Sequence, residues 1–179
     1  MAGKHLGTRN IILCGFMATG KSSVGKKLAS LMNYEFVDMD ALIEAEEGMS
    51  IPQIFAARGE PAFRELECRM VERLAERTGC VVATGGGTIV NPKNLELLKR
   101  GGVVITLTAN EETILRRAGK GDSRPMLLGG DRLERIRNLM KQREPFYLQA
   151  DIVLDTSSLK INEVVRRLAE LLQDFGIHS

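Results

Sequence analysis

Short apolar runs recur along the chain, and segments with helical spacing of apolar residues separate most of them. The runs are rich in β-branched residues, which is typical of buried strands. After the first run, Val24, Leu28 and Leu31 follow one another at spacings of four and three, as expected on one face of a helix. This alternation predicts an α/β sandwich around a mostly parallel sheet. The expected strands are NIILC (10–14), YEFVD (34–38), CVVAT (80–84), VVITL (103–107) and DIVLD (151–155).

Capping and stop residues mark the helices between these strands. Ser50 and Gln53 have the spacing of a capping box and predict a helix start, and Gly59 predicts its end. A second helix is expected to run from the Asn-Pro pair to the first glycine of NPKNLELLKRGG, 91–102. The last helix, near 161–175, carries apolar residues on one face, so we expect it to cover the core.

Composition and charge exclude several classes of protein. The 179 residues are expected to form one domain, 1–179. A net charge of +2, with two Tyr, six Phe and no Trp, indicates no nucleic-acid partner. The chain has no apolar run of ~20 residues and no signal-peptide core at its start, so a membrane partner is not expected either. Cys14, Cys68 and Cys80 lack metal-ligand spacing and are interpreted as packed thiols of a cytoplasmic protein.

The first expected strand is followed by GFMATGKSS, in which Gly15, Gly20, Lys21 and Ser22 fit the pattern G-x-x-x-x-G-K-[ST]. In this pattern backbone N–H groups surround nucleotide phosphates, the lysine reaches the terminal ones and the hydroxyl coordinates Mg²⁺. The strand before it and the helical spacing after it supply the required context, because a helix N-terminus favours anions. The sequence therefore predicts a phosphate-binding loop; a glycine turn with a solvated lysine is the alternative.

One segment, about 118–131, fits neither a strand nor a helix. It reads AGKGDSRPMLLGGD and combines four glycines with Lys120, Arg124 and a proline, which is too long for an ordinary turn. Arg116 and Arg117 stand at its entrance, so closure would bring several positive charges over a bound nucleotide. We interpret it as a mobile lid; the alternative is a solvated loop with incidental arginines.

Two carboxylates follow the second expected strand. Asp38 and Asp40 in YEFVDMD are two residues apart, and continued strand periodicity would place both on the same side. One could serve the metal and the other the hydroxyl that accepts the phosphoryl group. Asp40 also precedes a helical segment, so a helix cap is its alternative role.

Two arginines and a glycine triplet suggest an anionic acceptor. Arg64 and Glu67 share a helix face after Pro61, which fits an arginine aimed at an anion and held by its neighbour; a surface ion pair is the alternative. Arg143 is expected at the end of a helix stopped by Pro145, where it could instead complement the helix dipole. The triplet Gly85, Gly86 and Gly87 after the third strand predicts close approach of backbone to a ligand, although a tight turn is possible.

Taken in order, GFMATGKSS, FVDMD, FRELE, GGGT, SRPML and REPFY closely resemble the shikimate kinase family, which is part of the nucleoside-monophosphate-kinase-like P-loop group. The resemblance covers nearly the whole chain. It implies a three-layer sandwich whose five-stranded parallel sheet has the order 2-3-1-4-5, with a mobile lid and a shikimate-binding helical region at about 40–70. The implied reaction transfers the γ-phosphoryl group of ATP to the 3-hydroxyl of shikimate, in aromatic amino acid biosynthesis. We expect a monomer whose partners are ATP and shikimate.

The resemblance also implies residue roles on the nucleotide side. Lys21 would contact the β and γ phosphates, Ser22 would coordinate Mg²⁺, and Asp38 would support the metal through water. Arg124 resembles the lid arginine that reaches the phosphates, and Arg117 resembles the arginine that lies against adenine. No motif identifies the adenine loop near Ser157 and Ser158. The implied nucleotide-binding residues are Gly15, Ala18, Thr19, Gly20, Lys21, Ser22, Ser23, Arg117 and Arg124.

On the acceptor side, Asp40 would accept hydrogen bonds from the shikimate hydroxyls and orient or deprotonate the nucleophile, which makes it catalytic together with Lys21 and Arg124. Arg64 and Arg143 would bind the carboxylate, and Gly86 would supply a backbone contact within the glycine triplet. Planar arginine forks and an acidic acceptor are the groups that a small hydroxylated carboxylate requires.

The chain departs from the family pattern at Ala18, where the family usually has glycine, so the loop there must accommodate a Cβ. Other kinases of small metabolites, such as gluconate or nucleoside monophosphates, are the nearest alternatives; Arg64, Arg143 and the glycine triplet favour a compact carboxylate instead. A GTPase switch would carry an [NT]-K-x-D stretch, which is absent from the sequence.

Overall fold

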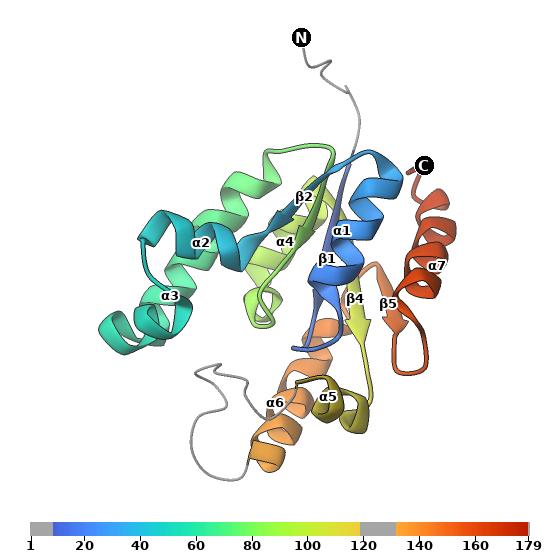
Figure 1. Cartoon of the computed structure of the whole chain (residues 1–179). Helices are drawn as coiled ribbons and strands as arrows, with labels where there is room; N and C mark the ends of the chain where they lie inside the picture. Colours follow the sequence, from blue (N-terminus) through green and yellow to red (C-terminus); the bar gives the residue numbers. More distant parts are fainter. Residues whose placement is uncertain (1–8, 119–131, 179) are drawn as a thin grey trace.

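The computed structural model describes residues 9–118 and 132–178. Five parallel strands form one sheet in the order β2-β3-β1-β4-β5, with helices on both faces (Figure 1). The predicted α/β class, the parallel sheet and the order 2-3-1-4-5 are therefore confirmed. The strands are β1 (Asn10–Gly15), β2 (Glu35–Asp38), β3 (Cys80–Ala83), β4 (Gly102–Thr108) and β5 (Ile152–Asp155).

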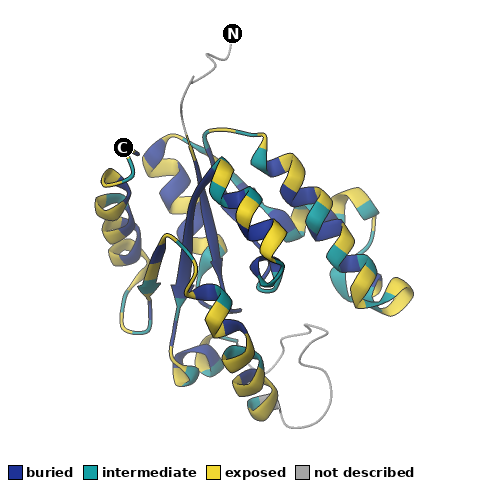
Figure 2. Ribbon diagram, turned by 180° about the vertical axis from the view of Figure 1, so that it is seen from behind, coloured by how far each residue is buried: buried dark blue, intermediate teal, exposed yellow. Residues whose placement is uncertain are grey.

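Burial follows position in the sheet. Every residue of β1 and β3 is buried, which explains why these strands read as continuous apolar runs (Figure 2). The edge strands β2 and β5 include exposed positions, because helices cover them less completely. The central strand β1 ends in the phosphate-loop sequence, so a fully buried strand leads directly into that loop.

The helices form two layers. α1 (Lys21–Met32) and α7 (Ile161–Gln173) cover one face and bury residues such as Leu28 and Leu168 against β1 and β4. α3 (Ile51–Ala75) and α4 (Pro92–Gly101) contribute to the core on the other face. The remaining helical segments are α2 (Met39–Glu47), the 3₁₀ turn η1 (Thr88–Val90), α5 (Glu111–Ala118) and α6 (Arg132–Tyr147). α5 and α6 lie beyond the carboxyl ends of the strands, at the bottom of Figure 1.

The capping and stop predictions are confirmed, with one correction. Ser50 and Gln53 form a capping box, and the helical geometry that begins there is interrupted at the predicted stop, Gly59, which has the non-helical values φ 77° and ψ 172°. A second helical segment follows this kink within α3. Proline was expected to end the helix that carries Arg143, whereas α6 includes Pro145 and ends at Tyr147. Proline removes the one helix hydrogen bond that its own N–H would donate. Because Pro145 lies two residues before the end of α6, only the last turn of the helix is affected.

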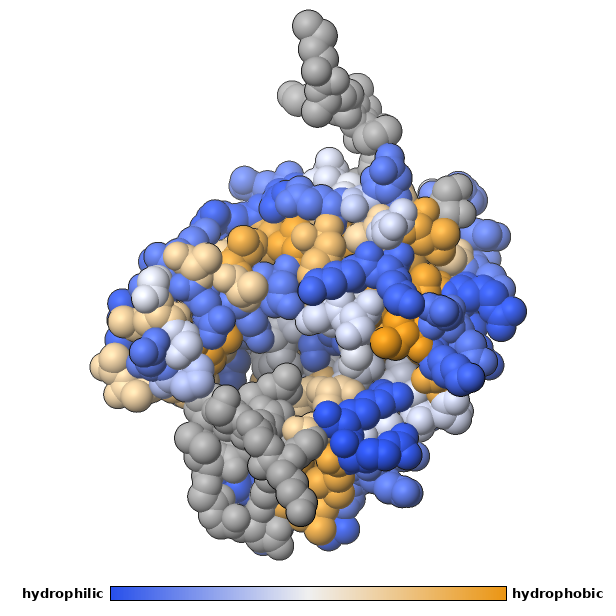
Figure 3. All heavy atoms as spheres, in the orientation of Figure 1, coloured by the Kyte–Doolittle hydropathy of each residue, from blue (hydrophilic) through white to orange (hydrophobic). Residues whose placement is uncertain are grey.

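The predicted lid, about 118–131, and its Arg124 lie outside the described residues except for Ala118, the last residue of α5. Within 9–118 and 132–178, no helix has the length and apolar character needed to cross a membrane. Hydrophilic residues cover much of the face seen in Figure 3, with separate hydrophobic areas between them.

Candidate active site

The carboxyl ends of β1, β2 and β3 meet at one edge of the sheet, where they border a cavity of about 650 Å³. Parallel strands deliver their following loops to the same edge, so motifs far apart in sequence come together there. The cavity is lined by the phosphate-loop sequence, both predicted aspartates, the glycine triplet and both predicted acceptor arginines. These lining residues include Ala18, Gly20, Lys21, Ser22, Ser23, Asp38, Asp40, Arg64, Gly85, Gly86, Gly87 and Arg143.

The loop between β1 and α1 is shaped by glycines at its ends. Gly15 has φ 131° and Gly20 has φ 99°, conformations that side chains oppose. A Cβ at Gly15 would lie 2.2 Å from the carbonyl oxygen of Leu107, so no other residue fits between β1 and β4 there. The Lys21 ammonium donates to the carbonyls of Gly15 and Phe16, each at 2.9 Å, and so reaches back along the loop. α1 begins at Lys21 with its N-terminus facing the same cavity lining.

Ala18 occupies the left-handed region, with φ 59°. The loop therefore keeps a conformation that glycine adopts more easily, at a cost of roughly 1–2 kcal/mol for a residue with a Cβ. The next residue, Thr19, is buried, and its hydroxyl donates to the carbonyl of Phe16 at 2.8 Å. Position 18 thus carries a Cβ in a left-handed turn.

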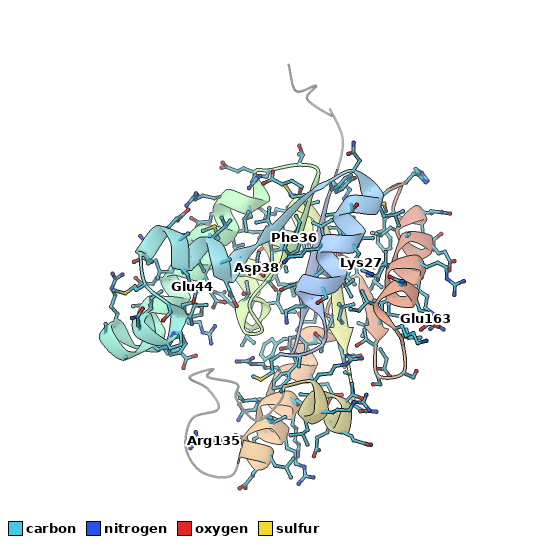
Figure 4. The ribbon with its side chains drawn as sticks, in the orientation of Figure 1. Lys27, Phe36, Asp38, Glu44, Arg135 and Glu163 are labelled. Atoms are coloured by element: carbon cyan, nitrogen blue, oxygen red, sulfur yellow. The ribbon has the colours of Figure 1, made fainter. Side chains whose placement is uncertain are left out.

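Ser22 and Asp38 bring two oxygen ligands together. The Ser22 hydroxyl donates to Asp38 Oδ2 at 2.9 Å, while Asp38 Oδ1 caps α2 by accepting from the Ala41 amide at 3.3 Å. Figure 4 labels Asp38 at the end of β2 and Glu44 on the following helix. A hydroxyl and a carboxylate suit Mg²⁺, which takes oxygen ligands and keeps several waters. The pair fits that ion.

The expected roles of the two aspartates need one correction. Strand periodicity does not place Asp38 and Asp40 on the same side, because the strand ends at Asp38 and Asp40 lies in the first turn of α2. The helix cap is Asp38, not Asp40. Both carboxylates still line the cavity, because the change from strand to helix occurs at its wall.

The first glycine of the triplet marks where two carboxylates converge. A Cβ at Gly85 would lie 2.9 Å from Asp40 Oδ1 and 2.8 Å from Glu67 Oε1. The sequence signal, three glycines at the end of a strand, predicted close approach to a ligand. In the structure, these glycines also make room for the side chains of the site itself, as Gly86 and Gly87 do for the two arginines.

Arg64 is held by two carboxylates through three hydrogen bonds. Its Nη1 donates to Glu67, and its Nη2 and Nε donate to Glu60 Oε1 at 2.7 and 3.1 Å. The Glu67 side chain is 1% exposed and also accepts from the Thr88 hydroxyl at 2.7 Å. Burial works to lower the pKa of the Arg64 guanidinium, but the charges and hydrogen bonds of Glu67 and Glu60 outweigh it and raise that pKa. The alternative of a simple surface ion pair is therefore wrong for the Arg64–Glu67 pair, which is anchored in the protein.

Arg143 lies next to the second glycine of the triplet, Gly86. The residue is 9% exposed, and its guanidinium carbon lies 5.9 Å from the centre of the Phe16 ring. Tyr147, one turn further along α6, donates its hydroxyl to the carbonyl of Gly86 at 2.7 Å. Burial raises the pKa of Tyr147 to about 12, against the opposing charge of Arg143, so this hydroxyl remains a donor at neutral pH.

Sequence reasoning missed several residues that hold the site together. Glu60 has the helical i, i+4 spacing to Arg64 that could have identified it, whereas Thr88, Tyr147 and Thr156 carry no such local signal. Thr156 contacts Arg117: Nη1 of Arg117 donates to the Thr156 hydroxyl at 3.1 Å and Nη2 donates to the Thr156 carbonyl at 2.8 Å. Arg117 does not line the cavity of the phosphate loop and arginines. Arg117 lies at the loop after β5, where the Thr156 hydroxyl also lies 3.3 Å from the carbonyl of Thr19.

A phosphate loop between β1 and α1, opening on the same cavity as two arginines and a carboxylate, defines a P-loop kinase of a small molecule. Residues 17–173 match the family model described as shikimate kinase. The chain belongs to the shikimate kinase family.

Individual relatives agree with this assignment. The shikimate kinase of Thermoanaerobacter pseudethanolicus is 46% identical over 160 residues, which cover 89% of this chain and 94% of that protein. The shikimate kinase of Geobacter metallireducens is 44% identical over 165 residues, 92% of each chain. Among solved structures, a shikimate kinase from Acinetobacter baumannii in complex with shikimate has a TM-score of 0.90 and 35% identity, covering 94% of this chain and 95% of its own.

Proposed function

We infer that the protein is an ATP-dependent kinase that phosphorylates shikimate, a step of the shikimate pathway, and that the acceptor is its 3-hydroxyl. The observation that carries this inference is that one cavity is lined by the phosphate loop, by Arg64 and Arg143, and by Asp40. A kinase needs a donor and an acceptor side by side, and a small hydroxylated carboxylate needs arginines at one end and an acidic acceptor at the other.

On the acceptor side, Arg64 and Arg143 bind the substrate carboxylate. Arg64 uses the donors that remain after those given to Glu67 and Glu60, or displaces the exposed Glu60. Asp40 accepts a hydrogen bond from the hydroxyl to be phosphorylated and holds its oxygen toward the phosphate loop. Because this interaction strengthens as the nucleophile loses its proton, Asp40 acts mainly on the rate of transfer rather than on binding.

On the donor side, the backbone amides of Gly20, Lys21, Ser22 and Ser23 bind the phosphates, and Lys21 neutralises charge that develops on the transferred group. Ser22 and Asp38 would hold Mg²⁺, which would supply charge neutralisation on the phosphates when bound. Gly15, Ala18 and Thr19 shape the loop, and Arg117 lies against the adenine. Arg124, outside the described residues, keeps its expected role at the phosphates, and we propose that the protein acts as a monomer.

A coupled assay of ADP release tests the function. Purified protein with Mg²⁺ and ATP is given shikimate, gluconate, AMP or no acceptor, and NMR of the product locates the new phosphate ester. We expect ADP release that depends on shikimate and an ester at the 3-oxygen. Asp40→Asn should lower kcat at least 100-fold with little change in KM for shikimate. ADP release that is equal without an acceptor, or faster with gluconate or AMP, would contradict the proposal.

A further inference from the structure

The loop after β5 carries a buried threonine with contacts to three other parts of the protein. Thr156 is 2% exposed. Its hydroxyl oxygen lies 2.9 Å from the carbonyl of Thr108 at the end of β4, 3.3 Å from the carbonyl of Thr19 in the phosphate loop, and 3.1 Å from Nη1 of Arg117. Its own carbonyl accepts from Nη2 of Arg117 at 2.8 Å. One side chain therefore connects β4, the phosphate loop, α5 and the loop after β5.

The hydrogen-bonding capacity of Thr156 suits this position. A hydroxyl has one donor and two acceptor lone pairs, so it donates to one of the two carbonyls while it accepts from the guanidinium. Both terminal nitrogens of the planar Arg117 guanidinium donate to Thr156, one to its hydroxyl and one to its carbonyl. Two such bonds fix both the position and the plane of the guanidinium, whereas a single bond would leave it free to rotate. An exposed arginine on a short helix would otherwise sample many rotamers.

The other end of α5 is fastened to the same loop. Ser157 Oγ accepts from the Asn110 amide at 2.8 Å, and Asn110 Oδ1 accepts from the Thr113 amide at 2.9 Å at the start of the helix. Asp155 orients Ser157, accepting from its hydroxyl at 2.5 Å and from its amide at 2.9 Å. The loop at 155–157 therefore holds α5 at both its first and its last turn, and Arg117 cannot shift without breaking these contacts.

We propose that Thr156 is a positioning residue of the nucleotide site, which holds the Arg117 guanidinium in one plane against the flat heterocyclic base and links it to the phosphate loop. The inference rests on the proposed function, since it requires Arg117 to face the base of the nucleotide. A guanidinium plane stacks on an aromatic ring, and stacking depends on orientation. The contact between the Thr156 hydroxyl and the Thr19 carbonyl sets the distance between the base end and the phosphate end of the site.

Titration calorimetry on the full chain tests this role with ATP analogue, inorganic tripolyphosphate and shikimate. Thr156→Val keeps the shape and removes the hydroxyl, and it should raise the Kd of the ATP analogue about 10-fold, the effect of losing one hydrogen bond to a charged group. Tripolyphosphate has no base, so its Kd should stay within about twofold, as should that of shikimate. Thr156→Ser keeps the hydroxyl and should restore binding of the analogue to near the parent value.

Two further variants separate positioning from general damage. Thr106→Val removes another buried hydroxyl, one that donates to the carbonyl of Tyr147 at 3.0 Å, and it should leave the Kd of the analogue unchanged. Arg117→Ala should weaken the analogue as Thr156→Val does, and combining the two should weaken it no further than Arg117→Ala alone, because they act through one contact.

The outcomes distinguish this inference from the proposed function. The positioning role would be overturned if Thr156→Val weakened the binding of tripolyphosphate as much as that of the ATP analogue. It would also be overturned if the effects of Thr156→Val and Arg117→Ala on the Kd of the analogue were additive. In either case, phosphorylation of shikimate by the parent protein would still support the proposed function. An Arg117→Ala variant with unchanged affinity for the analogue would overturn the positioning role as well. If the variants bind the ATP analogue as expected but the parent protein does not phosphorylate shikimate, the role of Thr156 is supported and the proposed acceptor is contradicted.

Discussion

At the scale of single residues, the acceptor side depends on how Arg64 is supported. Glu67 is buried behind it and shares a second hydrogen bond with Thr88, so the guanidinium meets a fixed carboxylate. Glu60, by contrast, is 46% exposed and can move. An arginine fixed on one side and adjustable on the other is suited to accept a substrate carboxylate without first ordering its own side chain.

Arg64→Ala should raise the Kd of shikimate by about 10- to 150-fold, because it removes charge-assisted hydrogen bonds worth roughly 1.5–3 kcal/mol. The affinity for an ATP analogue should change little. Arg64→Lys should restore only part of the shikimate affinity, since a point charge loses the bidentate geometry. Calorimetric titration measures both ligands. The control is Arg73→Ala on the same helix, which removes an exposed ion pair with Glu46; an equal effect of that variant would contradict a specific role for Arg64.

Lys21→Ala should reduce kcat by on the order of 10²- to 10³-fold in a folded protein, because the lysine neutralises charge that builds on the transferred phosphoryl group. Steady-state kinetics with saturating shikimate measures the loss, and circular dichroism checks the fold. Lys27 on the same helix, which donates to Asn162 at 2.6 Å, is the matched control. Near-parental turnover by Lys21→Ala would mean that the loop does not bind the donor phosphates.

At the scale of elements, two glycines of the turn after β3 leave room for the side chains of two arginines. The third glycine, Gly87, faces the Arg64 guanidinium so closely that a Cβ would lie 2.6 Å from Nη1 and 3.0 Å from Nη2. The second glycine, Gly86, has Nη1 of Arg143 3.2 Å from the corresponding position. The turn therefore lets two arginines from α3 and α6 approach one strand end, and neither helix could supply this arrangement alone.

Gly87→Ala should weaken shikimate binding about 10-fold, because the added methyl pushes the end of a flexible side chain out of place and disrupts its charge-assisted hydrogen bonds. The melting temperature and the affinity for an ATP analogue should stay close to those of the parent, since Gly87 has a negative φ. Titration of the single variant and of Gly87→Ala/Arg64→Ala is the measurement. If the double variant binds shikimate more weakly than Arg64→Ala alone, Gly87 acts by another route.

At the scale of the whole molecule, one hydrophobic core encloses two titratable groups, Cys14 and Tyr147, that stay neutral in the folded state. Burial raises the pKa of the Cys14 thiol in β1 to about 11, from an ordinary value of 9.0, although Thr84 and Lys21 act in the opposite direction. Burial likewise raises the pKa of Tyr147 to about 12, from 10.0. Each group keeps its proton to a higher pH when the protein is folded than when it is unfolded.

The protein should therefore lose stability in alkali. Below pH 9 the contribution of Cys14 is fully present; between pH 9 and about 11 the unfolded chain releases the proton while the folded protein retains it, so the free energy of unfolding falls. Urea unfolding at pH 8, 9, 10 and 11 measures the slope. Cys14→Ala should give a shallower decline with pH, whatever its stability at pH 8, and Cys68→Ala serves as the control. Identical slopes for the parent and Cys14→Ala would contradict this account.

The sequence by itself determined the class of fold and much of the site. Alternating strand and helix patterns require parallel strands with crossover helices, so the α/β class follows from periodicity. The phosphate loop is local, because its glycines, lysine and serine act through backbone conformations set within a few residues. Resemblance supplied the strand order, which the structure confirms. The cap at Asp38 and the passage of α6 through Pro145 were not predicted, since a local pattern cannot say where a strand becomes a helix or whether a proline ends one.

Tertiary structure alone decided which side chains meet. Glu67 holds Arg64 firmly because Thr88, 21 positions later, donates to it inside the protein, and Thr156 reaches Thr19 across 137 positions. No periodicity signals such contacts, because they arise where loops from different strands arrive at the same edge of the sheet. The same is true of the raised pKa values of Cys14 and Tyr147, which depend on what covers each group. Burial and long-range hydrogen bonds are properties of packing, and packing is known only once every element has its place.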